Sequence, residues 1–158
     1  MTENYLQILT ESLEKKLDVL DRISEVNKRQ FEVSTKRPFD MEAYDAVMDE
    51  KAALIEELNH LDEGFTSTYE LVREEVQKEP EKYRQKVLRM QELVREAVDK
   101  GVSVEAQEKR NKGSMDAALN TKRKEIRERK VSASAATKYY SAVSRLNNVD
   151  PQLMDRKK

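Results

Sequence analysis

Apolar residues recur at steps of three and four along most of this chain, with charged residues between them. That spacing places an apolar stripe on one face of a helix with 3.6 residues per turn. Proline is poorly tolerated inside helices, and the three prolines fall between the apolar stretches, at Pro38, Pro80 and Pro151. The pattern predicts three long helices, over about residues 3–32, 40–78 and 80–129.

Each predicted helix has an apolar seam. The first comprises Leu6, Leu9, Leu13, Leu17, Leu20, Ile23, Asn27 and Phe31. The second comprises Val47, Leu54, Leu58, Leu61, Phe65, Tyr69, Val72 and Val76. The third comprises Tyr83, Val87, Met90, Val94, Ala97, Gly101 and Val104, and resumes after a polar stretch (105–114) with Met115, Ala118, Leu119 and Ile126. Because the register survives that stretch, we expect one helix there and not two, with any bend near Gly101 or Gly113.

Three residues interrupt the seams. Asn27 is a lone polar seam residue, which is typical of a position that fixes the register between helices. Lys51 is expected to lay its stem over apolar surface while its ammonium reaches water. Gly64 either admits a closely packed neighbouring helix, which we favour, or bends the second helix slightly.

The helix boundaries also have sequence signals. Asp40 is placed as the N-cap of the second helix, where its carboxylate accepts from exposed amides of the first turn. Phe39 is expected to pack on Tyr44 or a nearby apolar residue. Pro80 fits the first position of the third helix.

The chain changes character after Lys130. Residues 131–136 are small and uncharged, which indicates a hinge. A short amphipathic pattern follows, made of Ala136, Tyr139, Tyr140, Val143 and Leu146. An isolated helix of about 12 residues is marginal in water, so this segment must dock on the bundle or on another molecule. Tyrosines of this kind either anchor an interface or cap the end of the bundle, and spacing alone leaves both open.

These patterns predict an all-α protein, an antiparallel bundle of three long helices with a short C-terminal amphipathic helix. We divide the chain into a bundle (1–130) and a hinge with a binding tail (131–158). Alanine, glutamate, lysine, leucine and arginine make up 77 of 158 residues, a share typical of long helices. Disorder competes for so polar a chain, but the regular apolar spacing favours helices.

Charge is distributed unevenly. Residues 1–79 carry 20 acidic and 10 basic residues, whereas residues 80–158 carry 11 acidic and 20 basic residues. We expect acidic and basic helices to face each other in one bundle, or else a basic docking surface near the C-terminal end. The densest basic run, 122–130, is a weak nucleic-acid candidate because Glu125 and Glu128 lie within it and no aromatic residue accompanies it.

The chain lacks the residues for common catalytic chemistry. It has no cysteine, a single histidine (His60) and no glycine-rich phosphate loop, so we expect no enzyme, metal or cofactor. No run approaches about 20 consecutive apolar residues, and residues 1–4 do not begin a signal peptide. We therefore expect a soluble, cytoplasmic protein.

Three stretches, residues 50–65, 108–112 and 135–140, occur in an order that resembles the FlgN family of flagellar export chaperones. The resemblance implies an all-helical cytoplasmic protein that binds hook–filament junction proteins and delivers them to the flagellar type III export gate. It places cargo contact in the C-terminal segment, on Ala136, Tyr139, Val143 and Leu146, with Tyr140 as the alternative anchor. The family associates a tyrosine of this region with docking at the gate, and the adjacent tyrosines leave their roles open.

The main alternative is a coiled-coil scaffold or dimerisation module without dedicated cargo, in which a homodimer is one arrangement. Deleting residues 131–158 would change little in such a scaffold. Binding of nucleic acid through residues 122–130 is a weaker alternative, and it would collapse between low and moderate salt.

Overall fold

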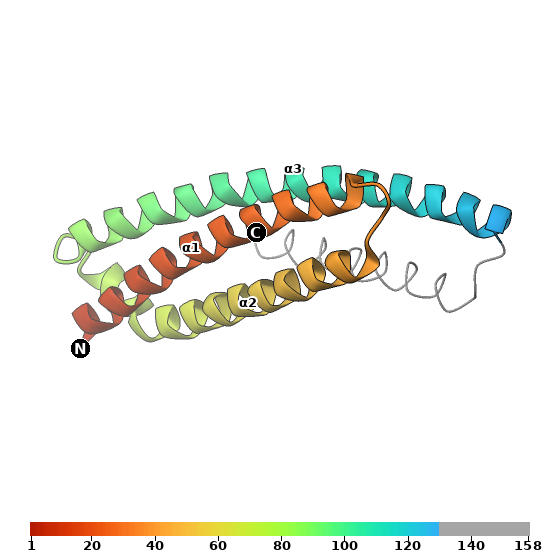
Figure 1. Ribbon diagram of the computed structural model, residues 1–158. Helices are drawn as coiled ribbons and strands as arrows, with labels where there is room; N and C mark the ends of the chain where they lie inside the picture. The colour runs from red at the N-terminus through yellow and green to blue at the C-terminus, as the bar shows by residue number, and fades with distance from the viewer. Residues whose placement is uncertain (130–158) are drawn as a thin grey trace.

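The computed structural model describes residues 1–129, and within that range all regular structure is helical (Figure 1). The helices are α1 (Thr2–Thr35), α2 (Met41–Lys78) and α3 (Arg84–Arg129). The predicted all-α class and the three long helices are thus confirmed. The predicted hinge and tail, residues 131–158, lie outside the described residues.

The start of α2 matches its sequence signals. The Asp40 carboxylate accepts a hydrogen bond of 3.1 Å from the backbone amide of Ala43. The rings of Phe39 and Tyr44 lie 5.7 Å apart between centroids. The predicted N-cap and the predicted packing of Phe39 are therefore both confirmed.

The start of α3 differs from the prediction. Residues 80–83 form a turn and the helix begins at Arg84, so Pro80 is not its first residue. The Val87 amide donates to the Tyr83 carbonyl at 3.0 Å, and the Tyr83 side chain is buried in the core. The turn carries Tyr83 into the core before the helix starts. From there α3 continues through Gly101 and Gly113 to Arg129 as one helix.

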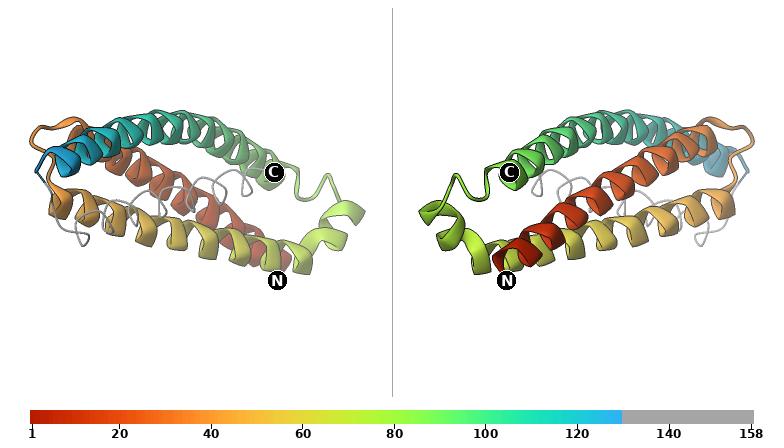
Figure 2. Two further views of the ribbon diagram at one scale, coloured as in Figure 1. Left: turned by 90° about the vertical axis from the view of Figure 1, so that its right-hand side faces the viewer. Right: turned by 90° about the vertical axis from the view of Figure 1, so that its left-hand side faces the viewer.

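α1 is the central helix of the bundle. It packs against both α2 and α3, whereas no Cα atom of residues 41–78 lies within 8 Å of one of residues 84–129. In the views turned by 90°, α1 crosses obliquely between α2 and α3 (Figure 2). The bundle is therefore held together through α1.

The core consists of three clusters along the bundle. The cluster in the middle contains Val19, Leu20, Ile23, Val26, Val47, Leu54, Ile55, Leu58, Ala97 and Val104. The cluster near the start of α1 contains Leu6, Leu9, Leu13, Val72, Tyr83, Met90 and Leu93. The cluster near the α1–α2 loop contains Tyr44, Met48, Met115 and Leu119. Most predicted seam residues thus lie in or against the core.

Two seam expectations are wrong. Val94 is 42% exposed, while its neighbour Leu93 is 1% exposed and occupies the core position. A Cβ atom added to Gly64 would meet no atom within 4 Å, so this glycine does not admit a closely packed helix. The prediction at Val94 failed because steps of three and of four both continue a helical stripe, and Leu93 takes the shorter step.

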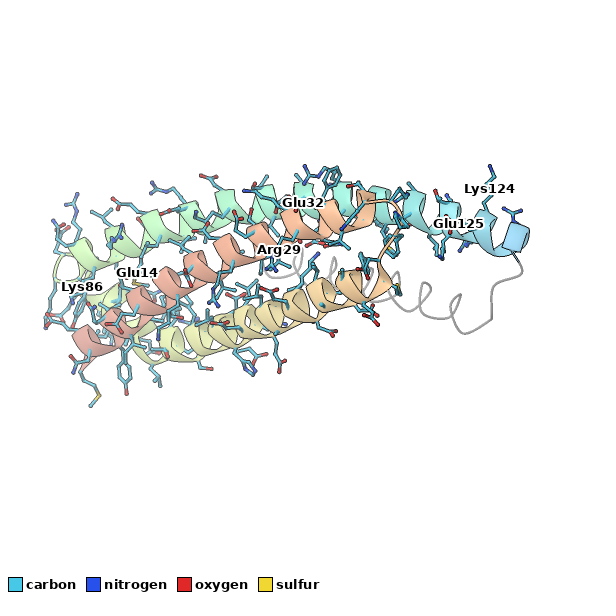
Figure 3. All side chains as sticks on the ribbon, viewed as in Figure 1. Glu14, Arg29, Glu32, Lys86, Lys124 and Glu125 are labelled. Carbon is cyan, nitrogen blue, oxygen red and sulfur yellow. The ribbon has the colours of Figure 1, made fainter. Side chains whose placement is uncertain are left out.

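Charged side chains cover the outer faces of the three helices (Figure 3). Ion pairs join α1 to each neighbour: Arg29 to Glu50 of α2 at 2.6 Å, and Lys100 of α3 to Asp21 at 2.7 Å. The hydrogen bond from Arg29 lowers the pKa of Glu50, and the hydrogen bond to Asp21 raises the pKa of Lys100. Of the acidic half of the chain, α1 packs directly on α3 of the basic half, whereas α2 does not, because α1 lies between α2 and α3.

Candidate protein-binding groove

An open groove of about 860 Å³ lies between α2 and α3, with α1 as its floor. It exists because α2 and α3 both pack on α1 and not on each other. Its lining is largely apolar: Leu13, Leu20, Leu58, Leu61, Phe65, Val94, Ala97, Val98, Gly101 and Val104, with Ser12, Lys16, Asp62, Glu63, Thr66 and Ser67 as polar members. We call this feature the α2–α3 groove.

The α3 wall of the groove exposes apolar surface. Val94 and Val98 line it and are 42% and 44% exposed. The wall runs from Val94 to Val104, which at 1.5 Å per residue is about 15 Å, or close to three helical turns. An amphipathic helix of about ten residues presents side chains over the same length, so the groove has the dimensions to receive one.

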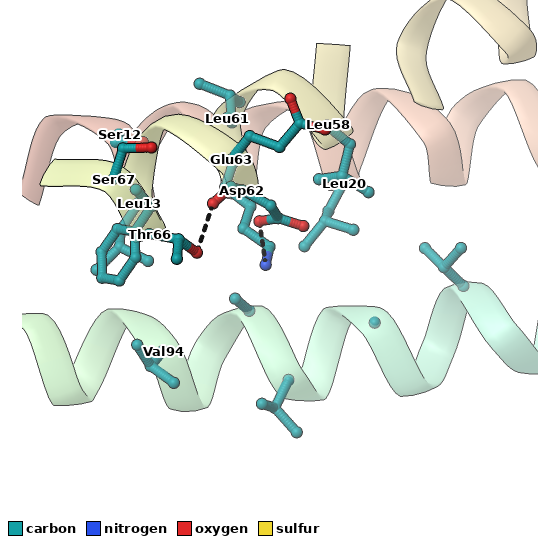
Figure 4. A pocket seen from close by; sticks show the side chains of 16 residues that line it. Ser12, Leu13, Leu20, Leu58, Leu61, Asp62, Glu63, Thr66, Ser67 and Val94 are labelled. Carbon is teal, nitrogen blue, oxygen red and sulfur yellow. Dashed lines mark hydrogen bonds and ion pairs between the residues drawn. The ribbon is translucent and has the colours of Figure 1, made fainter. Parts of the chain in front are cut away.

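The α2 wall carries an ordered polar group. Lys16 of α1 and Asp62 form an ion pair with 2.8 Å between Nζ and Oδ1, and the Thr66 hydroxyl donates to the Asp62 carbonyl at 3.0 Å (Figure 4). The other carboxylate oxygen, Asp62 Oδ2, is buried and has no hydrogen-bond partner within residues 1–129. Because a buried carboxylate oxygen is stabilised by a donor, a segment in the groove gains by placing an amide or hydroxyl there.

A buried polar layer crosses the bundle next to the groove. The ammonium of Lys51 in α2 is within hydrogen-bond distance of Gln30 Oε1 in α1 and of a carboxylate oxygen of Glu108 in α3. Lys51 is 0% exposed and Glu108 2%. The expectation that the Lys51 ammonium reaches water is therefore wrong, because Gln30 and Glu108 bind it inside the bundle.

The polar layer extends along the α1–α3 contact. The Asn27 side chain donates to Gln107 Oε1 at 3.2 Å, and Asn111 donates to the Asn27 carbonyl at 3.0 Å. Asn27 and Asn111 are both fully buried. Such amides match only one relative position of two helices, so the layer fits the register role predicted for Asn27.

Sequence reasoning missed four members of this layer: Gln30, Gln107, Glu108 and Asn111. We treated residues 105–114 as a polar gap in the third seam. The signal was present, because Val104, Glu108, Asn111 and Met115 continue the seam in steps of four, three and four. A polar residue at a seam position had been recognised at Asn27 and was overlooked here.

The other residues considered from the sequence form no reactive site in the described part of the chain. The His60 side chain is 73% exposed, and its nearest acidic partner is Glu56 at 3.8 Å. No group of three or more histidine, aspartate or glutamate residues within residues 1–129 is arranged to hold a metal ion. Ala136, Tyr139, Tyr140, Val143 and Leu146, the predicted cargo-binding residues, lie outside the described residues.

The basic run 122–130 begins in the part of α3 that extends beyond the α1–α2 loop (Figure 1). Within it, Lys122 pairs with Glu125 at 3.3 Å. Part of its positive charge is therefore compensated locally, as the interleaved glutamates indicated.

None of the helices described over residues 2–129 is both long and apolar enough to span a membrane. No protein-family model matches the chain, and no similar protein was found among curated proteins or solved structures.

Proposed function

We propose that this chain is a non-enzymatic binding protein that holds a helical segment of another protein. The observation that carries the proposal is the α2–α3 groove, with its exposed Val94 and Val98 on one wall and the buried Asp62 oxygen on the other. Grooves between helices bind amphipathic helices by covering their apolar face, and polar groups at the wall orient them. No bond in the partner needs to be made or broken.

The resemblance to FlgN-like proteins supplies the partner class. On this proposal the chain is a cytoplasmic export chaperone in which three helices form an antiparallel bundle and the C-terminal segment is an amphipathic helix. It binds flagellar hook–filament junction proteins, prevents their premature assembly and delivers them to the export gate. Ala136, Tyr139, Val143 and Leu146, with Tyr140 as the alternative anchor, contact the cargo.

Calorimetric titration of the full chain with purified hook–filament junction proteins tests this function. We expect a dissociation constant of about 1 µM or tighter, which corresponds to about 8 kcal/mol of binding free energy. Absence of binding to any junction protein would leave the coiled-coil scaffold, including a homodimer, as the better account. A sedimentation measurement on the same samples identifies that homodimer.

The tail residues have a separate test. Tyr139→Ala with Val143→Ala is expected to weaken cargo binding at least tenfold, because the loss of two large apolar contacts at an interface typically exceeds about 1.4 kcal/mol. Ser141→Ala with Ser144→Ala is the matched control on the same segment and should bind cargo like the unchanged chain. If the two double variants have equal effects on binding, the face of the segment that carries Tyr139 and Val143 does not bind cargo.

A further inference from the structure

The three helices leave the α2–α3 groove open, like a four-helix bundle in which one helix is missing. α2 and α3 bury α1 from two sides, while Val94 and Val98 of α3 remain more than two-fifths exposed. Four-helix bundles close this gap by adding a fourth apolar stripe over the same floor. A segment carrying such a stripe is present in the chain itself, after α3.

Charge matches this segment to the groove. α2, which forms one wall, carries 11 acidic and 3 basic residues, and Asp62 and Glu63 lie in the groove lining. Residues 130–158 carry 6 basic and 2 acidic residues, whereas residues 1–129 carry 24 basic and 29 acidic residues. A tail of net positive charge is therefore attracted to a body of net negative charge, and most strongly to the α2 side.

The length of the tail also fits. Val98 lies 31 residues before Arg129, about 46 Å back along α3 at 1.5 Å per residue. If residues 130–138 are extended and 139–148 are helical, Asn148 reaches about 45 Å from Arg129. Val143 and Leu146 then lie level with Val104 and Gly101, which line the groove.

We propose that the C-terminal segment, residues 136–148, occupies the α2–α3 groove of its own chain when no cargo is bound. Tyr139, Tyr140, Val143 and Leu146 form the apolar stripe of its helical part, which covers the groove floor, and Ala136 lies in the extended part that leads to it. The inference concerns the cargo-free chain, so its test needs no flagellar protein. If the proposed function also holds, cargo must displace the segment from the groove.

Cysteine cross-linking of the full chain tests the proposal, because the natural sequence contains no cysteine. The test variant carries Val98→Cys with Asn147→Cys, which leaves all five apolar tail residues in place. The control carries Ser103→Cys with Asn147→Cys: Ser103 is exposed, is nearer to Arg129 in sequence, and lies about 140° around α3 from Val98. A merely tethered tail would reach Ser103 at least as readily as Val98.

Under mild oxidation of dilute protein, we expect the Val98 pair to form an intramolecular disulfide at least tenfold faster than the Ser103 pair. Denaturing gels separate the cross-linked monomer from a cross-linked dimer. Equal rates would overturn the proposal. Predominant dimers from the Val98 pair would also overturn it, and would assign the groove to the tail of a second copy.

Hydrogen exchange in the full chain gives a measurement that does not depend on disulfide geometry. Val98→Glu is expected to accelerate amide exchange of residues 139–146 at least tenfold, whereas Ser103→Glu should leave it unchanged. Both sites are partly or fully exposed, so circular dichroism should show the same helicity for both variants. Tail amides that exchange at the rate of an unfolded peptide in the unchanged chain would also contradict the proposal.

Discussion

At the scale of single residues, the most informative contact is between Lys51 and Glu108. A lysine and a glutamate, both essentially inaccessible to water, meet in the core of a bundle whose surface carries many exposed ion pairs. Removing charged groups from water costs several kcal/mol per ion, and their attraction offsets that cost only when the partners are in place. The pair therefore adds little net stability while making the relative position of α2 and α3 specific.

Lys51→Met is expected to lower the free energy of unfolding by about 3–5 kcal/mol, because the Glu108 carboxylate stays buried without its ammonium partner. Lys51→Met combined with Glu108→Leu should recover most of that loss, because an apolar pair of similar volume avoids the desolvation cost. Urea denaturation of the two variants measures both effects.

Arg29→Met provides a comparison with an ion pair on the surface. Arg29 and Glu50 are each about half exposed, so the loss should be below about 1 kcal/mol. If Lys51→Met proves no more costly than Arg29→Met, the polar layer is hydrated and our account of it is wrong.

At the scale of helices, sequence periodicity predicted the number of helices and most of the core, because a seam of Leu, Ile and Val repeats over many turns. Boundaries marked by specific chemistry, such as the Asp40 cap, were also predictable. The local sequence pattern did not predict the position of side chains that are placed by tertiary contacts. Lys51 lies inside the bundle because residues distant in sequence, Gln30 and Glu108, bind it there.

The α2–α3 groove was not predictable for the same reason. Each seam implies that its helix packs on something, but not that α1 is the shared partner of the other two. The proposed C-terminal segment had a sequence signal in its apolar stripe, and the segment itself lies outside the described residues.

Gly64 and Gly113 each lie inside a long helix, and neither would bring an added Cβ within 4 Å of another atom. We expect Gly64→Ala and Gly113→Ala each to raise the free energy of unfolding by about 0.5–1 kcal/mol, because alanine loses less backbone entropy on forming a helix. Chemical denaturation measures the gain. A loss of stability at Gly64 would show that something packs against it, as the sequence alone suggested.

At the scale of the whole molecule, stability depends on α1 because α2 and α3 meet mainly through it. Leu58 of α2 belongs to the same cluster as Ile23 of α1 and Val104 of α3, so this cluster links all three helices. A charge placed there affects the entire bundle and not one helix.

Leu58→Asp is expected to unfold the bundle, because Leu58 is 2% exposed and the new carboxylate would have no partner in an apolar cluster. Leu71→Asp is the matched control on the same helix: Leu71 is 67% exposed, and we expect a change within about 0.5 kcal/mol. Thermal melting followed by circular dichroism distinguishes the two. Full helicity and an unchanged melting temperature for Leu58→Asp would invalidate the core described here.

The central position of α1 has a consequence for how the chain is made. A ribosome releases α1 first and completes α2 at Lys78, 51 residues before α3 ends at Arg129. At about 5–20 residues per second, that interval lasts roughly 3–10 s. For those seconds a nascent α1–α2 hairpin displays the face of α1 that α3 later covers. During this interval the uncovered face of α1 is exposed on the polysome. The α3 helix of a neighbouring copy can then pack against it.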